Sequence, residues 1–137
     1  MQDDLPQETT ATILKLLVVD DEKIIRTGLG KLGADLGFEV ATAEDGQMGW
    51  EVFQDFKPDL VVLDIYMPKI NGILLMYKIK EADPNCSVVL ITGFLHYEQL
   101  VRRSKVRPDG FILKPFRLEM ISDMLLRLAE KRQEAMV

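Results

Sequence analysis

The sequence has a single cysteine, Cys86, and no long apolar run. One thiol cannot form an internal disulfide framework, and it cannot build a zinc site with several thiolate ligands. No apolar stretch reaches the roughly 18–20 residues that a membrane-spanning helix needs. The first ten residues also lack the basic and then apolar pattern of a secretory signal. We therefore expect a cytoplasmic protein that does not bind a membrane.

Positive charge is in deficit as well. The chain has 17 lysines and arginines against 22 aspartates and glutamates, which gives a net charge of −5. Because nucleic acid binding requires basic side chains to neutralise phosphates, we expect no direct nucleic acid binding by this chain. Its 137 residues, 47% hydrophobic and 28% charged, fit one globular domain rather than a disordered chain.

Short apolar runs alternate along the chain with segments of helical periodicity. The apolar runs predict strands at 13–19, 38–43, 60–63, 87–91 and 110–113. Apolar residues at helical spacing predict helices at 22–36, 46–56, 72–82 and 117–132, and a weaker pattern covers 95–105. This alternation predicts an α/β fold with a single doubly wound parallel sheet that is covered by helices on both faces.

Polar residues follow four of the predicted strands. They are Asp20 and Asp21 after the first strand, Asp64 after the third, Thr92 after the fourth and Lys114 after the fifth. Each could be a helix cap or a surface charge if taken alone. Because ligands of such sheets bind at the carboxyl ends of the strands, we expect these side chains to converge on one site.

The converging residues have a specific chemistry. Three clustered carboxylates repel one another unless a cation is present, and oxygen ligands alone favour a hard ion such as Mg²⁺, or Mn²⁺ in its place. A carboxylate can attack phosphorus to form an aspartyl-phosphate, while an ammonium and a hydroxyl suit the phosphoryl oxygens. The site is therefore predicted to accept phosphate at an aspartate.

Two other α/β functions fit less well. A flavin mononucleotide site needs glycine and hydroxyl contacts after the first strand, where the acidic residues 20–22 would repel a phosphate. A haloacid-dehalogenase-like phosphatase needs a second acid two residues beyond the nucleophile, and this chain has Tyr66 there.

Four ordered motifs closely resemble the receiver domains of bacterial response regulators, in the CheY-like superfamily of two-component signal transduction. These motifs are Val18-Val19-Asp20-Asp21-Glu22, Leu63-Asp64-Ile65-Tyr66-Met67-Pro68 with Asn71-Gly72, Ile91-Thr92-Gly93, and Phe111-Ile112-Leu113-Lys114-Pro115-Phe116. The resemblance implies a flavodoxin-like sheet of strand order 2-1-3-4-5 flanked by five helices, with a cis peptide bond between Lys114 and Pro115. We assign residues 13–130 to the receiver domain, 1–12 to a flexible N-terminal tail, and 131–137 to a C-terminal tail or the start of a linker helix.

The resemblance also implies a role for each site residue. Asp64 would be the phosphoacceptor of a phosphorelay, phosphorylated by a histidine kinase, a phosphotransfer protein or a small donor. Asp20, Asp21, Asp64 and the backbone carbonyl of Tyr66 would hold the Mg²⁺, and Thr92 and Lys114 would bind the phosphoryl oxygens. Such a domain is not an enzyme in the usual sense, since it catalyses only its own phosphorylation and slow dephosphorylation.

In this family, phosphorylation is transmitted by a threonine and an aromatic side chain, here Thr92 and Phe111. Thr92 would be drawn toward the phosphoryl group and Phe111 would turn inward, which alters the face formed by helix 4, strand 5 and helix 5. That face would control a downstream protein or output domain. Phosphorylation-linked homodimerisation is common in the family, so a second copy of the chain is also among the implied partners.

Two aromatic residues, Tyr66 and Phe94, follow Asp64 and Thr92 at a distance of two residues each. We expect both rings at the mouth of the site, where they would exclude the water that hydrolyses the aspartyl-phosphate. The sequence leaves two alternatives open. The chain could be the receiver of a longer protein, or it could be an interaction module that never takes phosphate.

Overall fold

Five parallel strands form one sheet in the computed structural model, which describes residues 12–94 and 101–136. The strands are β1 (Lys15–Val19), β2 (Glu39–Ala43), β3 (Leu60–Asp64), β4 (Ser87–Thr92) and β5 (Gly110–Leu113). They lie in the order β2-β1-β3-β4-β5, and every neighbouring pair is parallel. The predicted doubly wound, flavodoxin-like fold class and the 2-1-3-4-5 order are confirmed.

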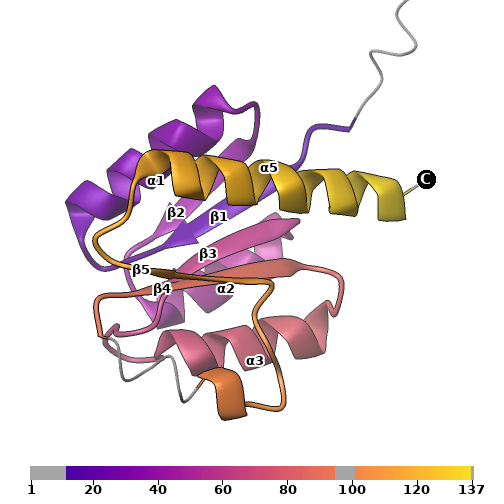
Figure 1. The fold of residues 1–137 in the computed structure, drawn as a ribbon. Helices are drawn as coiled ribbons and strands as arrows, with labels where there is room; N and C mark the ends of the chain where they lie inside the picture. Colours follow the sequence, from indigo (N-terminus) through magenta and orange to yellow (C-terminus); the bar gives the residue numbers. More distant parts are fainter. Residues whose placement is uncertain (1–11, 95–100, 137) are drawn as a thin grey trace, which may run out of the picture.

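Helices cover both faces of this sheet (Figure 1). Helices α1 (Lys23–Asp35) and α5 (Leu118–Ala135) lie on one face, and α2 (Gly46–Phe56) and α3 (Gly72–Ala82) lie on the other. Residues 101–103, the described part of the segment predicted as a further helix, are helical. Residues 95–100 lie outside the described residues, as does the expected N-terminal tail apart from Thr12.

The core consists of two apolar clusters separated by the sheet. Leu16 and Val18 of β1 pack into the cluster under α1 and α5, whereas Leu17 and Val19 pack into the cluster under α2 and α3. Successive side chains of a strand point to opposite faces, so a strand covered on both sides must be apolar throughout. Every residue of β3 is buried, including its last residue, Asp64. The helix-covered sheet therefore holds a carboxylate at the end of its central strand.

Two helices begin where the sequence predicts because a polar side chain caps them. Asp45 Oδ1 accepts a 2.8 Å hydrogen bond from the amide of Met48 at the start of α2. Asn71 Oδ1 accepts a 2.9 Å bond from the amide of Leu74 at the start of α3. These caps satisfy amides that have no partner inside the helix.

Strand ends differ from the predictions by one or two residues. β1 begins at Lys15, the first residue paired with β2, and not at residue 13. β3 and β4 each continue for one polar residue beyond the apolar run, because Asp64 pairs with Ile91 and Thr92 pairs with Leu113. Strand pairing depends on the backbone, so a prediction from side-chain polarity alone places the ends of these two strands one residue too early.

Helix α5 extends three residues beyond its predicted end, to Ala135. Near that end, Arg132 Nε donates a 3.0 Å hydrogen bond to Asp59 Oδ1, and Arg132 also donates to the carbonyl of Asn85. Asp59 Oδ2 in turn accepts a hydrogen bond from the amide of Lys15. These contacts join the last turns of α5 to the segments in which β1, β3 and β4 begin. None of the helices within residues 12–94 and 101–136 is long and apolar enough to cross a membrane.

Candidate functional site

The predicted site residues meet at the carboxyl edge of the sheet. Asp20 follows β1, Asp64 and Thr92 are the last residues of β3 and β4, and Lys114 follows β5. Parallel strands bring their carboxyl ends to one edge, so these residues converge although they are far apart in the sequence. The Lys114–Pro115 peptide bond is cis, as expected.

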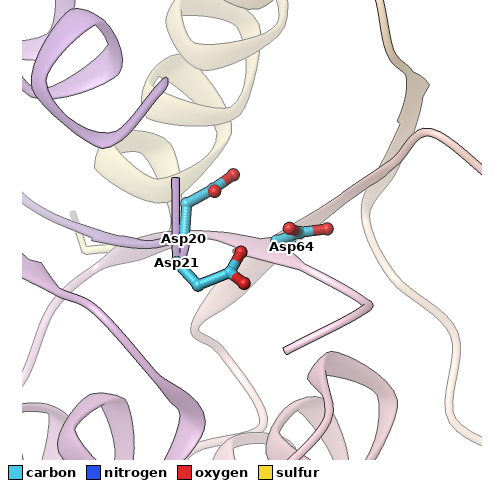
Figure 2. Close-up of side chains that lie close together, drawn as sticks. All are labelled: Asp20, Asp21 and Asp64. Carbon is cyan, nitrogen blue, oxygen red and sulfur yellow. The ribbon is translucent and has the colours of Figure 1, made fainter. Parts of the chain in front are cut away.

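Three carboxylates form an acidic cluster at this edge (Figure 2). One oxygen from each of Asp20, Asp21 and Asp64 lies within 4.8 Å of the other two. Asp20 is fully buried and Asp64 is 4% exposed, whereas Asp21 is exposed. The cluster therefore combines two desolvated carboxylates with one that faces solvent.

Burial and mutual repulsion disfavour the charged forms of the buried pair. Burial, followed by the negative charge of Asp20, raises the pKa of Asp64 from 3.8 to about 6. Burial also raises the pKa of Asp20. Two buried carboxylates that share one site must lose part of their charge or gain a cation.

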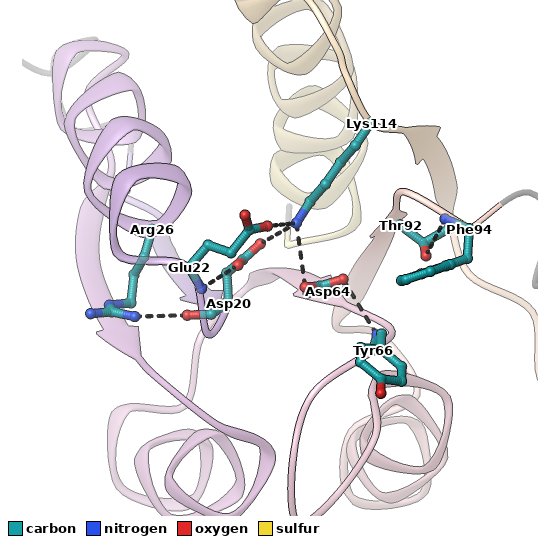
Figure 3. A network of polar contacts seen from close by, with 8 residues as sticks. All are labelled: Asp20, Glu22, Arg26, Asp64, Tyr66, Thr92, Phe94 and Lys114. Atoms are coloured by element: carbon teal, nitrogen blue, oxygen red, sulfur yellow. Dashed lines mark hydrogen bonds and ion pairs between the residues drawn. The ribbon is translucent and has the colours of Figure 1, made fainter.

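The ammonium of Lys114 supplies positive charge to this cluster (Figure 3). Its Nζ lies 2.6 Å from Glu22 Oε1, 3.2 Å from Asp20 Oδ2 and 3.3 Å from Asp64 Oδ2. Burial opposes the charged form, but the hydrogen bond to Glu22 and the charges of Asp64 and Asp20 raise the pKa of Lys114 above its ordinary value. Lys114 therefore remains a cation at any physiological pH.

The acidic cluster also fits a hard divalent cation. Asp20 Oδ1 accepts a 2.8 Å hydrogen bond from the amide of Glu22, whereas the buried Asp20 Oδ2 accepts none and has only the ion pair with Lys114 at 3.2 Å. A buried carboxylate oxygen without a hydrogen bond is costly unless an ion completes its environment. The donors are all oxygens, which suits Mg²⁺ or Mn²⁺ and does not favour a softer metal.

The loop after Asp64 is tied closely to the phosphoacceptor candidate. The amide of Tyr66 donates a 3.4 Å hydrogen bond to Asp64 Oδ1, and the amide of Gly72 donates a 2.8 Å bond to the carbonyl of Ile65. A Cβ atom at Gly72 would collide with the backbone carbonyl of Asp64. Glycine is therefore required for the start of α3 to approach the end of β3 this closely.

A pocket of about 270 Å³ opens beside Asp64. Its lining residues are Asp21, Glu22, Asp64, Tyr66, Gly93, Phe94 and Lys114. The rings of Tyr66 and Phe94 lie 5.2 Å apart, and both are substantially exposed. Both predicted aromatic residues therefore line the pocket next to the acidic cluster.

The two residues predicted to form a switch lie on neighbouring strands. Thr92 is fully buried, and its hydroxyl accepts a 3.1 Å hydrogen bond from the amide of Phe94 (Figure 3). Phe111 lies on β5 and packs, partly buried, against the apolar cluster under α2 and α3. Strand alternation turns Thr92 toward the same face as Leu90, which also belongs to that cluster.

Glu22 and Arg26 also contact the site, although neither was predicted from the sequence to have a role there. Glu22 makes the shortest contact of Lys114, and Arg26 donates a 2.9 Å hydrogen bond to the backbone carbonyl of Asp20. The sequence did signal Glu22, as the third acid in the run at 20–22. Arg26 gave no comparable signal, since an arginine in the first turns of a helix is ordinarily a surface charge.

Comparisons with known proteins show the family to which this chain belongs. Residues 16–126 match the family model of the response regulator receiver domain. The chemotaxis protein CheY of Listeria monocytogenes is 34% identical over 119 residues, which are 86% of this chain and 100% of CheY. The regulatory protein AtoC of Escherichia coli is 30% identical over 125 residues, which are 89% of this chain and 27% of AtoC.

A solved structure agrees with these sequence matches. The receiver domain of AraT, a response regulator from Geobacillus stearothermophilus, superposes with a TM-score of 0.82 at 28% identity. The superposition covers 92% of this chain and 100% of the AraT domain. The chain belongs to the response regulator receiver domains, the signalling modules of two-component systems.

Proposed function

We propose that Asp64 reversibly accepts a phosphoryl group in a Mg²⁺-dependent reaction and that this modification switches the surface of the domain. The observation that carries the proposal is the position of Asp64. Its carboxylate lies 3.3 Å from the ammonium of Lys114 and has an oxygen within 4.8 Å of carboxylate oxygens of Asp20 and Asp21, at the edge of an open pocket.

The chemistry is the transfer of a phosphoryl group to a carboxylate. An Asp64 oxygen attacks the phosphorus of a phosphohistidine or a small phosphate donor, and a new oxygen–phosphorus bond forms. The bond between phosphorus and the donor nitrogen or oxygen breaks, and the leaving atom keeps the electron pair. With a pKa of about 6, Asp64 is largely ionised at neutral pH and can act as the nucleophile.

Mg²⁺ would be held by the carboxylates of Asp20, Asp21 and Asp64 and by the backbone carbonyl of Tyr66. When bound, it supplies positive charge that offsets the charge developing on the transferred phosphoryl group. The Lys114 ammonium would bind one phosphoryl oxygen and the Thr92 hydroxyl would bind another. Both side chains stand at the carboxyl edge of the sheet: Thr92 ends β4, the neighbour of the strand that carries Asp64, and Lys114 follows β5, one strand farther along.

The phosphoryl group would signal through Thr92 and Phe111. The Thr92 hydroxyl, which accepts a hydrogen bond from the amide of Phe94, would turn toward a phosphoryl oxygen and donate its own hydrogen to it. Movement of this buried side chain leaves space that Phe111, which is only partly buried, would fill by turning inward. The outer face around β5 and α5 would change with it.

The proposed partners follow from this scheme. A histidine kinase or a phosphotransfer protein would be the donor, and a protein or an output domain would bind the changed face, as would a second copy of the chain. AtoC, of which this chain matches 27%, is a longer regulatory relative. Residues 13–130 would form the receiver, and residues 131–137 would lead toward an output domain or end the chain.

The direct test is phosphorylation of the purified chain. After incubation with acetyl phosphate and Mg²⁺, intact-mass spectrometry should show an adduct of about 80 Da, the mass of one phosphoryl group. The adduct should be absent from Asp64→Asn and from samples that contain EDTA. The matched variant Asp123→Asn, on the exposed side of α5, should be modified like the original chain. An adduct that persists in Asp64→Asn, or no adduct in any sample, would contradict the proposal.

A further inference from the structure

Glu22 occupies the N-cap position of α1 without capping the helix. Its backbone has the extended conformation of a cap residue, but its side chain makes no capping hydrogen bond. Instead, the carboxylate turns toward Lys114, which is 92 residues away in the sequence (Figure 3). The Glu22 carboxylate is therefore committed to Lys114 and not to the first turn of its own helix.

The ammonium of Lys114 is already surrounded by carboxylates. An ammonium has three N–H groups, and Lys114 Nζ lies within 3.3 Å of three carboxylates, those of Glu22, Asp20 and Asp64. The Glu22 contact, at 2.6 Å, is the shortest of the three. Nζ donates hydrogen bonds to Glu22 and Asp64, so a phosphoryl oxygen that arrives at Asp64 must compete with the Glu22 carboxylate for the ammonium.

Glu22 is the contact that is easiest to release. Asp20 is buried and Asp64 would carry the phosphoryl group, so neither can move away from the site. The Glu22 side chain is 60% exposed and can turn into solvent. Its carboxylate also lines the pocket beside Asp64, where its charge opposes an incoming anion.

From this geometry we infer that Glu22 is a positioning residue that holds the Lys114 ammonium in the unmodified protein and competes with the phosphoryl group for it. The inference rests on the proposed function, in which Lys114 binds a phosphoryl oxygen. Glu22 would make phosphorylation of Asp64 less favourable, and would thereby keep the unmodified state populated. Loss of the Glu22 carboxylate should strengthen binding of an anion at Asp64 and weaken binding of a cation at the acidic cluster.

Beryllofluoride, a mimic of the phosphoryl group, measures the first of these effects. We would compare the full chain with Glu22→Gln and with Glu119→Gln, which removes the same charge from an exposed position in the first turn of α5. At saturating Mg²⁺, Glu22→Gln should bind beryllofluoride about three- to tenfold more tightly, and Glu119→Gln should bind it like the original chain. Without fluoride, calorimetry should show weaker Mg²⁺ binding to Glu22→Gln. A variant that is merely less well folded would bind both ligands more weakly.

Glu22→Ser provides a second variant that does not depend on the stability of the first. Serine is a good N-cap residue, and its short side chain cannot reach Lys114, so α1 should gain a capping hydrogen bond while the contact with Lys114 is lost. It should also bind beryllofluoride more tightly than the original chain.

Unchanged or weaker beryllofluoride binding in both Glu22 variants would overturn the inference, and so would an equal gain in Glu119→Gln. If the original chain binds no beryllofluoride in the presence of Mg²⁺, the proposed function fails and the inference fails with it. If the original chain binds beryllofluoride but the Glu22 variants bind it no more tightly, the inference about Glu22 is rejected and the proposed function is not.

Discussion

The rings of Tyr66 and Phe94 lie 5.2 Å apart, tilted by 57°, at the pocket that opens beside Asp64. They come from two different loops, one after β3 and the other after β4. Aromatic rings at this spacing attract each other, so the pair is favoured as a unit over two separate exposed side chains. Together they narrow the approach to the carboxylate that we propose as the phosphoacceptor.

We predict that this aromatic pair prolongs the phosphorylated state. Hydrolysis of an aspartyl-phosphate needs a water molecule in line with the bond that breaks, and the two rings restrict its approach. The phosphorylated form should last many minutes or longer, and the double variant Tyr66→Asn, Phe94→Ala should lose its phosphate several-fold faster. Phosphate release or the decay of the mass adduct measures both rates.

The control for this prediction is Tyr77→Asn, because Tyr77 is an exposed aromatic residue that does not line the pocket. It should leave the decay rate unchanged. Decay of the original chain within minutes or less, or equal rates for the chain and the double variant, would count against a shielding role.

The raised pKa of Asp64 predicts a pH dependence of stability in the metal-free protein. Its pKa is about 6 in the fold and near 3.8 when the chain is unfolded, so the folded state binds the proton more tightly. Tighter proton binding by Asp64 in the fold therefore adds to the free energy of unfolding. This contribution is complete below about pH 4 and is lost as the pH rises through about 6. Asp64→Asn, which stays neutral, should become more stable than the original chain by about 1–3 kcal/mol between pH 4 and pH 7.

Urea unfolding at several pH values in the presence of EDTA measures this difference. Comparison of the two proteins at each pH cancels the titration of groups that they share. Free energies of unfolding that run parallel from pH 4 to pH 7 would show that Asp64 has an ordinary pKa.

Binding of Mg²⁺ should stabilise the fold through the acidic cluster. At a concentration 100 times its dissociation constant, a ligand that binds only the folded state adds about 2.7 kcal/mol to the free energy of unfolding. We predict this gain for the original chain and little of it for Asp21→Asn, which removes an exposed ligand without disturbing the core. Unfolding in MgCl₂ and in NaCl of equal ionic strength provides the measurement.

Asp123→Asn should retain the whole effect of Mg²⁺, because Asp123 is an exposed aspartate of α5 that does not belong to the acidic cluster. A gain of equal size in Asp21→Asn would mean that Mg²⁺ binds elsewhere.

The same substitution should have opposite effects at two helical glycines. Gly28 in α1 is exposed and a Cβ there would have nothing within 4 Å, so Gly28→Ala should stabilise the protein by about 1 kcal/mol. Gly72 at the start of α3 is buried, and a Cβ would collide with the carbonyl of Asp64. Gly72→Ala should therefore destabilise the protein by about 3 kcal/mol. Thermal or urea unfolding of both variants tests the pair, and a gain at Gly72 would show that the β3–α3 loop relaxes easily.

The convergence of the site could be predicted from the sequence because it depends on the backbone. Asp20, Asp64 and Lys114 follow buried apolar runs, and parallel strands bring their carboxyl ends to one edge. The partners of each side chain could not be predicted in the same way. The contact between Glu22 and Lys114 depends on the rotamers of two long side chains, which are set only after the strands have assembled.

Helix α1 also depends on tertiary contacts that the local sequence does not reveal. Glycines at 28, 30 and 33 lower its helix propensity, so local sequence favours the helix only weakly. It forms because Leu29 is buried in the core and Gly33 lies close against side chains of the sheet. Such tertiary packing, rather than propensity, supplies most of the stability of a helix in a folded protein.

The hydrogen bonds of Arg132 hold the last turns of α5, whereas apolar packing of Ile121 and Leu125 in the core holds its first turns. Arg132 contacts Asp59 and Asn85, just before β3 and β4 begin and thus at the opposite edge of the sheet from Asp64. Leu118 and Met120 at the beginning of α5 remain exposed. A rod anchored at one end can tilt about that anchor but is hindered from sliding along its own axis. We therefore expect a displacement that starts near Lys114 to shift the first turns of α5 within their apolar packing rather than to slide the whole helix past Arg132.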